Sequence, residues 1–527
     1  RFNGIVCRSG PQGRFSLRIF VIMWNRISLK LCYLTLSAFL WWSPILQAQV
    51  SVASNASAVN AALERAQLSG EYTLEACIAQ ALNQNIDVQL SMLSLSQSRY
   101  TLDQSIRNFG PDISGAAGQF YQSGRSIDRF TNQFVQSTIG SNNFQLQGSL
   151  LLFGGLQNVN NYKQANENWL ASEKDLKAIQ LTVTLQVASA YVQCLQAHAS
   201  QLAAAEVLES SKFQLERGEK IYKAGGSTQG ALLSLKAQVA NDAANLTNAE
   251  NVNATALQNL KQLIRVEFHK PFQPVYEDLG IISEPFEYSV GQLVDTILTK
   301  RPDYQAASFR VAAAEFGLRS AKGALMPTLS VGGSLNTVYS DNAKLVDNVS
   351  IAGFSPIGRV QGTNELVEAP QYTYSMKTKA FGDQVHDNFG RSLGINLNIP
   401  IYSGLSRQNQ VKSANLGVLR AQLNRDRIQQ NVQNEVLTAF NNFKNAEKRF
   451  NANLENKNLQ SQNQLYVKQR YDAGAASYFE YQMALASSAA ANQNYISAKY
   501  ELAFRRLVLE FYLRPDPYQT QINSTQN

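Results

Sequence analysis

Four stretches of the chain alternate apolar or small residues with polar ones at a period of two. Because successive side chains of a β-strand point to opposite faces, this pattern predicts four strands. The two clearest sets are Phe144, Leu146, Gly148, Leu150 and Leu152, and Leu393, Ile395, Leu397, Ile399 and Ile401. Their partners begin at two prolines, Pro111 and Pro327. We place the strands at about 111–121, 143–153, 327–338 and 391–402.

These strands have the length and dyad repeat of strands that cross an outer membrane. A half-buried strand of a soluble sandwich alternates in the same way, and one strand alone would favour that reading. Four strands, each fused to a very long helix, favour the membrane. Four strands cannot close a barrel, and open sheet edges are not tolerated in lipid. Several copies of the chain must therefore share one barrel.

Long helices are predicted after the strands. Proline is absent from 112–270 and from 401–514, and glycine from 156–217, so nothing there removes a backbone donor. Apolar residues recur in steps of four and three, the seam of a supercoiled helix pair. They are Leu181, Leu185, Ala188, Val192, Leu195, Ala199 and Leu202 in one helix, and Val432, Val436, Ala439, Phe443, Ala446 and Phe450 in the other.

The length of these helices excludes an ordinary globular bundle, although an amphipathic bundle helix has the same seam. About 65 residues at roughly 1.5 Å each span about 100 Å. Shorter return helices are expected at 228–266 and 477–512. Residues 178–205 contain no Asp, Glu, Lys or Arg, but their glutamines would be unsatisfied in hydrocarbon, so we do not expect a transmembrane helix there.

The two halves of the chain repeat each other at fixed offsets, as expected of a duplicated unit. Pro111 recurs as Pro327, which sets the first offset at 216. Beyond the strands the offset is 249, because the segment FGGL ending at Leu156 recurs as YSGL ending at Leu405. Equal offsets along the helices mean that both helical hairpins have the same length.

The repeat defines the predicted domains. The first unit is 72–287 and the second 288–513, with an N-terminal linker at 49–71 and a polar tail at 514–527. The change of offset places an insertion in the second unit, around 340–388, which we expect to form an exposed external loop.

The first 48 residues have the pattern of a secretory signal peptide behind an upstream extension. Arg26 and Lys30 precede an apolar run at 31–45, and Leu46-Gln47-Ala48 resembles a cleavage site. A membrane anchor is the competing reading, but this run is shorter than the roughly 20 residues that a spanning helix needs.

The charge of the chain argues against a polyanionic partner. The net charge is +8, but six basic residues and no acidic ones lie before residue 49. The remaining 41 basic residues face 39 acidic ones. We therefore expect no nucleic-acid partner.

The sequence contains no constellation that indicates catalysis, a cofactor or a metal. His198, His269 and His386 lack metal-ligand spacing, and neither a phosphate-binding loop nor a nucleophile elbow occurs. Cys77 and Cys194 could pair in an oxidising compartment or remain two separate buried thiols, and the sequence leaves both open. We expect no enzyme.

Taken together, the chain resembles the TolC-type outer-membrane efflux proteins over about residues 72–513. The resemblance rests on the duplication, the YxAG turns and the joints between strands and helices, which contain Pro111, Gly155, Pro327 and Gly404. It implies a mainly α fold with a transmembrane β part. Three chains would share a 12-stranded β-barrel and build a periplasmic α-helical barrel in the outer membrane of a Gram-negative bacterium. The implied partners are a periplasmic adaptor and an inner-membrane pump, or a secretion ATPase.

The resemblance also implies a periplasmic gate and adaptor-docking site at the helix turns. The matching residues are Tyr222, Gly225, Tyr471, Asp472, Gly474 and Glu480. Ala476 lies where the family often has an arginine, and Ala231 replaces a common acidic residue, so a salt-bridged gate of the family's kind is not expected. Glu480 would give a ring of three carboxylates, or it is a solvated helix residue.

The function that this resemblance implies is a passive trimeric channel that exports small toxic compounds. A type I protein-secretion duct has the same features. A secreted coiled-coil structural protein or adhesin would also be long and rich in Ala, Asn and Gln, but its strands would then be soluble.

Overall fold

The computed structural model describes residues 69–127, 134–267, 269–276 and 290–514. The predicted signal segment 1–48, the linker up to residue 68 and the tail after Arg514 lie outside the described residues. So do the first residues of the second predicted repeat, 288–289.

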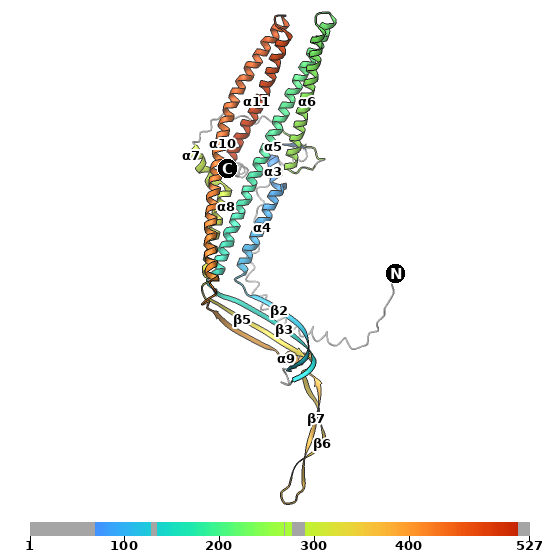
Figure 1. The fold of residues 1–527 in the computed structure, drawn as a ribbon, viewed down its shortest axis with the longest axis vertical. Coiled ribbons are helices and arrows are strands. Elements are labelled where there is room, and N and C mark those ends of the chain that lie inside the picture. The colour runs from blue at the N-terminus through green and yellow to red at the C-terminus, as the bar shows by residue number, and fades with distance from the viewer. Residues whose placement is uncertain (1–68, 128–133, 268, 277–289, 515–527) are drawn as a thin grey trace, which may run out of the picture. The chain divides into compact units, whose positions relative to one another are not determined.

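Two sets of helices account for most of the described chain (Figure 1). The first set is α3 (Leu74–Gln84), α4 (Ile86–Arg107), α5 (Gln157–Lys223) and α6 (Gln229–Leu263), and the second is α7 (Val290–Lys300), α8 (Pro302–Gly323), α10 (Ser406–Asp472) and α11 (Tyr478–Leu513). Helices α5 and α10 have 67 residues each, and the returning α6 and α11 have 35 and 36. The predicted long helices and shorter return helices are confirmed.

Local sequence explains where the shorter helices begin. The Thr73 hydroxyl accepts a hydrogen bond from the Ala76 amide at 3.2 Å at the start of α3. The Asn85 side chain accepts one from the Asp87 amide at 2.8 Å and separates α4 from α3. Pro302 opens α8, where its missing N–H and fixed φ cost nothing.

Each long helix buries its predicted seam in a hydrophobic cluster. In α5, Leu181, Ala188 and Leu195 pack with residues of α3 and the end of α6. In α10, Val432, Val436 and Phe443 pack with α7 and α11 in the same manner, through Leu293, Ile297, Leu502 and Leu509. Leu202 is 53% exposed, so its place in the seam was predicted wrongly. It lies beyond Leu195, the last α5 residue of this cluster.

The four predicted strands form one antiparallel sheet in the order β2-β3-β5-β8. Their bounds are β2 (Asp112–Ile127), β3 (Phe134–Gly154), β5 (Thr328–Ser340) and β8 (Gly390–Asn398). The first two strands are longer than predicted because they pair with each other as a hairpin as far as Ile127 and Phe134. Strand β8 stops at Asn398 rather than 402, since its partner β5 begins only at Thr328.

The expected loop at 340–388 is a folded insertion instead. Strands β6 (Lys344–Arg359) and β7 (Leu366–Thr378) form a separate antiparallel hairpin, and α9 (Phe381–Asp387) follows it. The expectation of exposure holds for the hairpin. It fails at Gln384 of α9, whose side chain is only 1% exposed and bonds to both backbone groups of Ser340, whereas most of the other α9 residues are exposed.

Two further strands are very short. β1 (Glu71–Tyr72) pairs in parallel with β4 (Gln273–Pro274) and ties the start of α3 to the segment after α6. Among the described residues, only α5 is long and apolar enough to cross a membrane as a helix. Half of its most apolar window is buried in the protein, so this is weak evidence for a helical span.

Candidate functional site: a two-faced sheet and paired helical tips

The four-stranded sheet has one apolar face. The strand register places Leu146 opposite Leu335, Leu150 opposite Val331, and Val331 opposite Ile395. The apolar and small residues on this face are Ile113, Gly115, Ala117, Phe144, Leu146, Gly148, Leu150, Phe153, Leu329, Val331, Gly333, Leu335, Leu393, Ile395 and Leu397, and Arg391 lies on the same face opposite Leu335. Ile395 is 73% exposed and Leu393 is 83% exposed. A soluble sheet would cover such side chains, and this one leaves them open.

The opposite face is polar and almost free of charge. It carries Ser114, Gln145, Gln147, Ser149, Ser330, Ser334, Asn336, Ser392 and Asn396, together with Asp112, Phe120 and Leu151. Ser334 and Ser392 share a hydrogen bond of 2.8 Å across β5 and β8. Within the strands the predicted alternation is correct except at Leu152, which lies in a bulge, so that Phe153 pairs with Leu329 in its place. The predicted positions Ile399 and Ile401 lie beyond the end of β8.

Both outer strands of this sheet have one open edge. Within the described residues β2 pairs only with β3, and β8 pairs only with β5. Each open edge presents a row of backbone N–H and C=O groups for another strand.

The joints between the sheet and the long helices have the same unusual backbone in both halves. Gly155 and Leu156 both have φ near +61°, and Gly404 and Leu405 have φ of +59° and +63°. A leucine in the left-handed region costs about 1–2 kcal/mol, and such strain persists only where the surroundings fix it. The strand-entry residues Pro111 and Pro327 each lie one residue before a strand, as predicted.

Gly155 is also packed against the end of α8. A Cβ atom at Gly155 would lie 2.1 Å from the carbonyl oxygen of Gly323, and a Cβ at Gly323 would lie 2.2 Å from that of Gly155. At Gly404 nothing lies within 4 Å. The first joint is therefore closed inside one chain, and the second is open.

The tips of the two helical hairpins have matching caps. Gly225, with φ of +78°, follows α5, and Gly474, with φ of +75°, follows α10. Their amides bond to the carbonyl oxygens of Tyr222 at 2.9 Å and Tyr471 at 3.0 Å. Together with the next amide in each turn, this is a Schellman motif. The predicted YxAG residues therefore terminate the long helices.

Contacts across the tips join the two hairpins. Arg217 Nη1 of α5 donates to Asp472 Oδ1 of α10 at 2.6 Å, and its guanidinium lies 5.9 Å from the centre of the Tyr471 ring. Tyr471 in turn stacks on Tyr481 at 5.4 Å and an interplanar angle of 10°. The amide of Gln214 bonds to the buried Tyr481 hydroxyl at 3.3 Å.

A salt bridge does occur at this end, but it is not of the kind that the family resemblance implies, so the expectation drawn from Ala476 and Ala231 stays a prediction. Ala476 cannot form one, but Arg217, five residues before Tyr222, forms it with Asp472. No sequence signal marks Arg217, because the pair joins residues 255 positions apart. The bond to Asp472 raises the pKa of Arg217 despite some opposing desolvation.

Glu480 caps its own helix in this structure. Its carboxylate accepts a hydrogen bond from the Ser477 amide at 2.9 Å, while the Ser477 hydroxyl accepts one from the Glu480 amide at 3.2 Å. This is a capping box at the start of α11. In the first half, Thr228 caps α6 at the Ala231 amide at 3.3 Å without an acidic partner.

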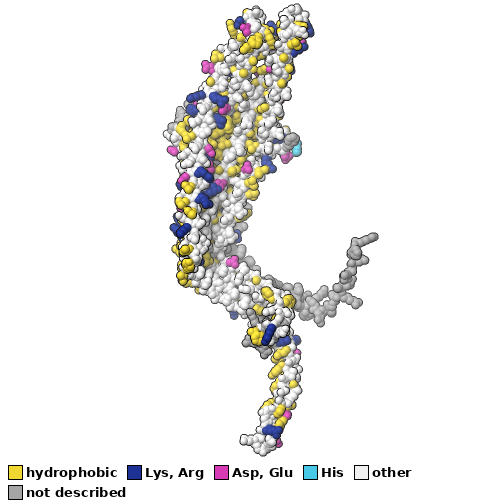
Figure 2. All heavy atoms as spheres, viewed as in Figure 1, with side chains coloured by type: hydrophobic (Ala, Val, Ile, Leu, Met, Phe, Trp, Pro, Cys, Tyr) yellow, Lys and Arg dark blue, Asp and Glu magenta, His cyan; other side chains and the backbone are white. Residues whose placement is uncertain are grey.

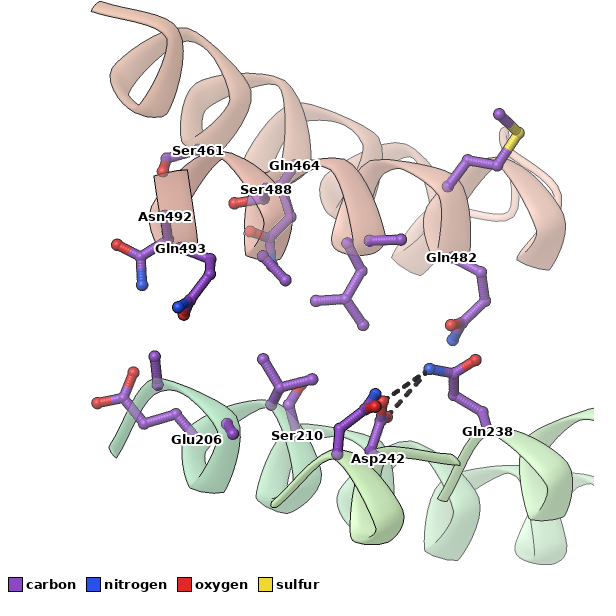
Figure 3. Close-up of a pocket in the computed structure, with 18 residues that line it drawn as sticks. Glu206, Ser210, Gln238, Asp242, Ser461, Gln464, Gln482, Ser488, Asn492 and Gln493 are labelled. Atoms are coloured by element: carbon purple, nitrogen blue, oxygen red, sulfur yellow. Dashed lines mark hydrogen bonds between the residues drawn. The ribbon is translucent and has the colours of Figure 1, made fainter. Parts of the chain in front are cut away.

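A polar groove lies between the two helical hairpins (Figure 3). It encloses about 770 Å³ between α5 and α6 on one side and α10 and α11 on the other. Its deepest charge is Asp242, which is 4% exposed. Both Asp242 oxygens accept from the Gln238 amide at 3.0 Å, and one accepts from the Ser211 hydroxyl.

The remaining chemical groups serve packing. Cys77 and Cys194 are both free and buried, and burial raises the pKa of both thiols. His198 stacks on Tyr276 with 3.7 Å between ring centres, and burial lowers its pKa. No cluster of three or more potential metal ligands occurs in the described ranges of the chain.

Comparison with known proteins decides the family. A family model described as outer membrane efflux protein matches residues 77–264 and 293–513, well over half of the chain. The chain belongs to the outer membrane efflux protein family. This family consists of transport proteins and not of enzymes, and membership places the protein in the outer membrane.

Individual relatives are distant. The cation efflux system protein CusC of Escherichia coli K12 is 24% identical over 280 residues, 51% of this chain and 56% of CusC. The pyoverdine export outer membrane protein OpmQ of Pseudomonas aeruginosa is 30% identical over 191 residues, 35% of this chain and 38% of OpmQ. The chain thus spans about half the length, or less, of the curated relatives it matches.

Solved structures extend the likeness in fold. A crystal structure of CusC matches with a TM-score of 0.66 at 18% identity, over 84% of this chain and 91% of that one. VceC from Vibrio cholerae matches with a TM-score of 0.64 at 17% identity, over 84% and 95%. At such identities the likeness concerns the fold alone.

Proposed function

We propose that this outer-membrane efflux protein is the passive channel of a tripartite pump. Three copies share one 12-stranded barrel and carry small toxic compounds from the periplasm to the exterior. A periplasmic adaptor contacts the channel, and an inner-membrane pump supplies the energy for transport. The observation that carries the proposal is the sheet with one apolar face, one polar face and two open edges.

The two faces suit the wall of a pore. Apolar residues that alternate with polar ones along each strand place one set in lipid and the other in a water-filled interior. Exposed leucines and isoleucines then lose contact with water, and the serine, glutamine and asparagine side chains face the lumen. Few charges lie on that face, so the lumen discriminates weakly among solutes.

The bounds of the helices support an internal duplication. Helix α7 begins and ends 216 residues after α3, which is the first offset of the sequence repeat. Helix α10 begins and ends 249 residues after α5, which is the second offset. Inside the chain, β3 of the first half pairs with β5 of the second. Repeating this contact pairs β8 with β2 of the next copy. A head-to-tail contact of this kind closes into a ring when its rotation allows it.

The repeat also gives the register of that seam. Gly148 lies opposite Gly333 within the chain. The residue 249 positions after Gly148 is Leu397, and the residue 216 positions before Gly333 is Ala117. The repeat therefore places Leu397 opposite Ala117 of the next copy. Both residues lie on the apolar face of the sheet, so the lipid-facing surface continues across the seam.

The same two offsets, applied to a contact between helices, predict a contact between neighbouring copies. Lys163 of α5 lies over the ring of Phe316 of α8, with 5.6 Å to the ring centre. The equivalent pair is Lys412 of α10 and Tyr100 of α4 in the next copy. Tyr100 is 68% exposed in the single chain, and the ring of copies covers it.

The tip contacts act as the periplasmic lock of this channel. The Arg217–Asp472 pair and the hydrogen bond from Gln214 to the Tyr481 hydroxyl join the two hairpins of one chain. The channel opens when the two hairpins separate, and this movement breaks only these non-covalent contacts. Asp472, Tyr471 and the capped turns at Gly225 and Gly474 therefore belong to the gate, and Glu480 supports it through its cap.

The groove between the hairpins suits an adaptor. A helical partner that lies in a groove between helices is a common mode of recognition. This groove is lined mainly by small and amide side chains, with Glu206 and Asp242 as its charges. An adaptor tip that donates hydrogen bonds, or carries a basic residue toward Asp242, fits it.

Cross-linking along the seam tests the proposal. With Ala117→Cys and Leu397→Cys in one chain, oxidation of the detergent-purified protein should give covalent trimers on a non-reducing gel. The matched control, Ala116→Cys with Leu397→Cys, places one thiol on the other face and should give none. A monomeric mass in mild detergent, or a bilayer in which neither the wild type nor Asp472→Asn conducts, would refute the channel.

A further inference from the structure

The β6–β7 hairpin has an apolar, aromatic face without a partner in the single chain. Cross-strand pairs define this face: Val346 with Met376, Val349 with Tyr374, Ile351 with Tyr372, and Phe354 with Pro370. Charged residues occur only toward its ends, where Lys344 pairs with Thr378 and Glu368 with Pro356. Tyr374 is 54% exposed and Ile351 is 56% exposed. Figure 2 shows hydrophobic side chains along this hairpin with only scattered charges between them.

The other face of the hairpin is hydrophilic. Its cross-strand pairs are Asn348 with Ser375, Ser350 with Thr373, and Gly353 with Gln371. Such a two-faced ribbon has one side suited to water and one side that requires cover. An isolated two-stranded hairpin is marginally stable in water unless its apolar face packs on something.

Lipid is a poor cover for this ribbon. β6 and β7 pair only with each other in the described part of the chain, so both edges carry unpaired backbone groups. Such groups are not satisfied in hydrocarbon. The hairpin also carries three basic and three acidic side chains between residues 344 and 378.

A second copy of the same hairpin is a suitable cover. β6 begins four residues after β5 ends, so each hairpin is attached to a sheet whose open edges call for neighbouring copies. The attachment is firm: the Lys379 amide bonds to the Ala343 carbonyl at 2.8 Å, and α9 is fixed to β5 by Gln384. The equal numbers of basic and acidic residues mean that copies do not repel each other.

We propose that the apolar faces of the β6–β7 hairpins from the three copies pack on one another and form a collar beyond the barrel. This inference rests on the proposed trimer. The collar is a second assembly contact, built by the insertion that the first half of the chain lacks. Its apolar residues lie inward against the other copies, and its polar face meets water.

Single cysteines at neighbouring positions test the collar. Tyr374→Cys lies on the apolar face and Thr373→Cys on the polar face of the same strand. Of the four native cysteines, Cys7 and Cys32 belong to the predicted signal segment, and Cys77 and Cys194 are both 0% exposed, so the latter two add little background to the processed protein. The purified trimer is treated with a soluble maleimide and, separately, with a short bis-maleimide.

The collar predicts that Tyr374→Cys is protected from the maleimide and forms covalent dimers and trimers with the bis-maleimide. Thr373→Cys should react freely and give no cross-linked product. Ile351→Cys with Ser350→Cys as control repeats the comparison on β6, in case the tyrosine is needed for folding.

The outcomes separate the collar from the channel. A trimer in which the cysteines at 373 and 374 react equally and do not cross-link overturns the collar and leaves the channel standing. Protection at 374 in whole cells that disappears in the purified trimer also overturns it, in favour of a different protein as the cover. A monomeric mass refutes the trimer and the collar together.

Discussion

Removal of the tip ion pair should open the channel. Arg217 and Asp472 are 42% and 40% exposed, and an ion pair with this exposure is worth about 0.5 kcal/mol. Three copies lose about 1.5 kcal/mol together, and about 1.4 kcal/mol corresponds to a tenfold change in an equilibrium. Asp472→Asn should therefore raise the ratio of open to closed channels by about tenfold.

The assay is conductance of the purified protein in a planar bilayer at two salt concentrations. The screening length is about 10 Å at 0.1 M salt and about 3 Å at 1 M. The wild-type channel should therefore approach the behaviour of Asp472→Asn at high salt, and the variant should depend less on salt.

Two controls distinguish the lock from a general effect of charge. Glu216→Gln removes the pair with Lys220, which lies within α5 and joins no hairpins, so it should leave the conductance unchanged. The exchange Arg217→Asp with Asp472→Arg restores opposite charges and should restore closure in large part. If Asp472→Asn leaves the conductance as it was, or if Glu216→Gln raises it equally, the ion pair is no part of the gate.

Three further predictions concern other parts of the structure. Glu480→Gln keeps the capping box and should conduct like wild type, whereas Glu480→Ala loses the hydrogen bond to the Ser477 amide, worth about 1 kcal/mol, and should conduct more; equal effects would instead indicate a ring of charges. Gly155→Ala drives a methyl group into the Gly323 backbone and should abolish assembled trimer on a native gel, which an unchanged yield would contradict. Arg301→Met removes a side chain that is 10% exposed and bonds to Glu435 at 3.0 Å. It should lower the free energy of unfolding in guanidinium by about 2–3 kcal/mol, less than for a fully buried pair because Glu435 is half exposed, and an unchanged midpoint would exclude this role.

The sequence by itself determined the elements and the family resemblance. Period-two alternation depends only on side-chain direction along a strand, and this is why the faces of β3 and β8 were predicted nearly residue by residue. The length of α5 and α10 followed from the absence of proline, and their ends followed from Gly225 and Gly474. These are local properties of the backbone, and local sequence is sufficient to specify them.

Only the tertiary structure decided which distant residues meet. The Arg217–Asp472 pair, the contact of Gly155 with Gly323 and the folded insertion at 344–387 depend on packing between segments far apart in the chain. Glu480 was recognised only by its position in the family, and its capping box was missed although the spacing of Ser477 and Glu480 is a local signal of a helix start. Sequence patterns record which face of an element is apolar, whereas the choice of partner for that face is set by the assembled fold.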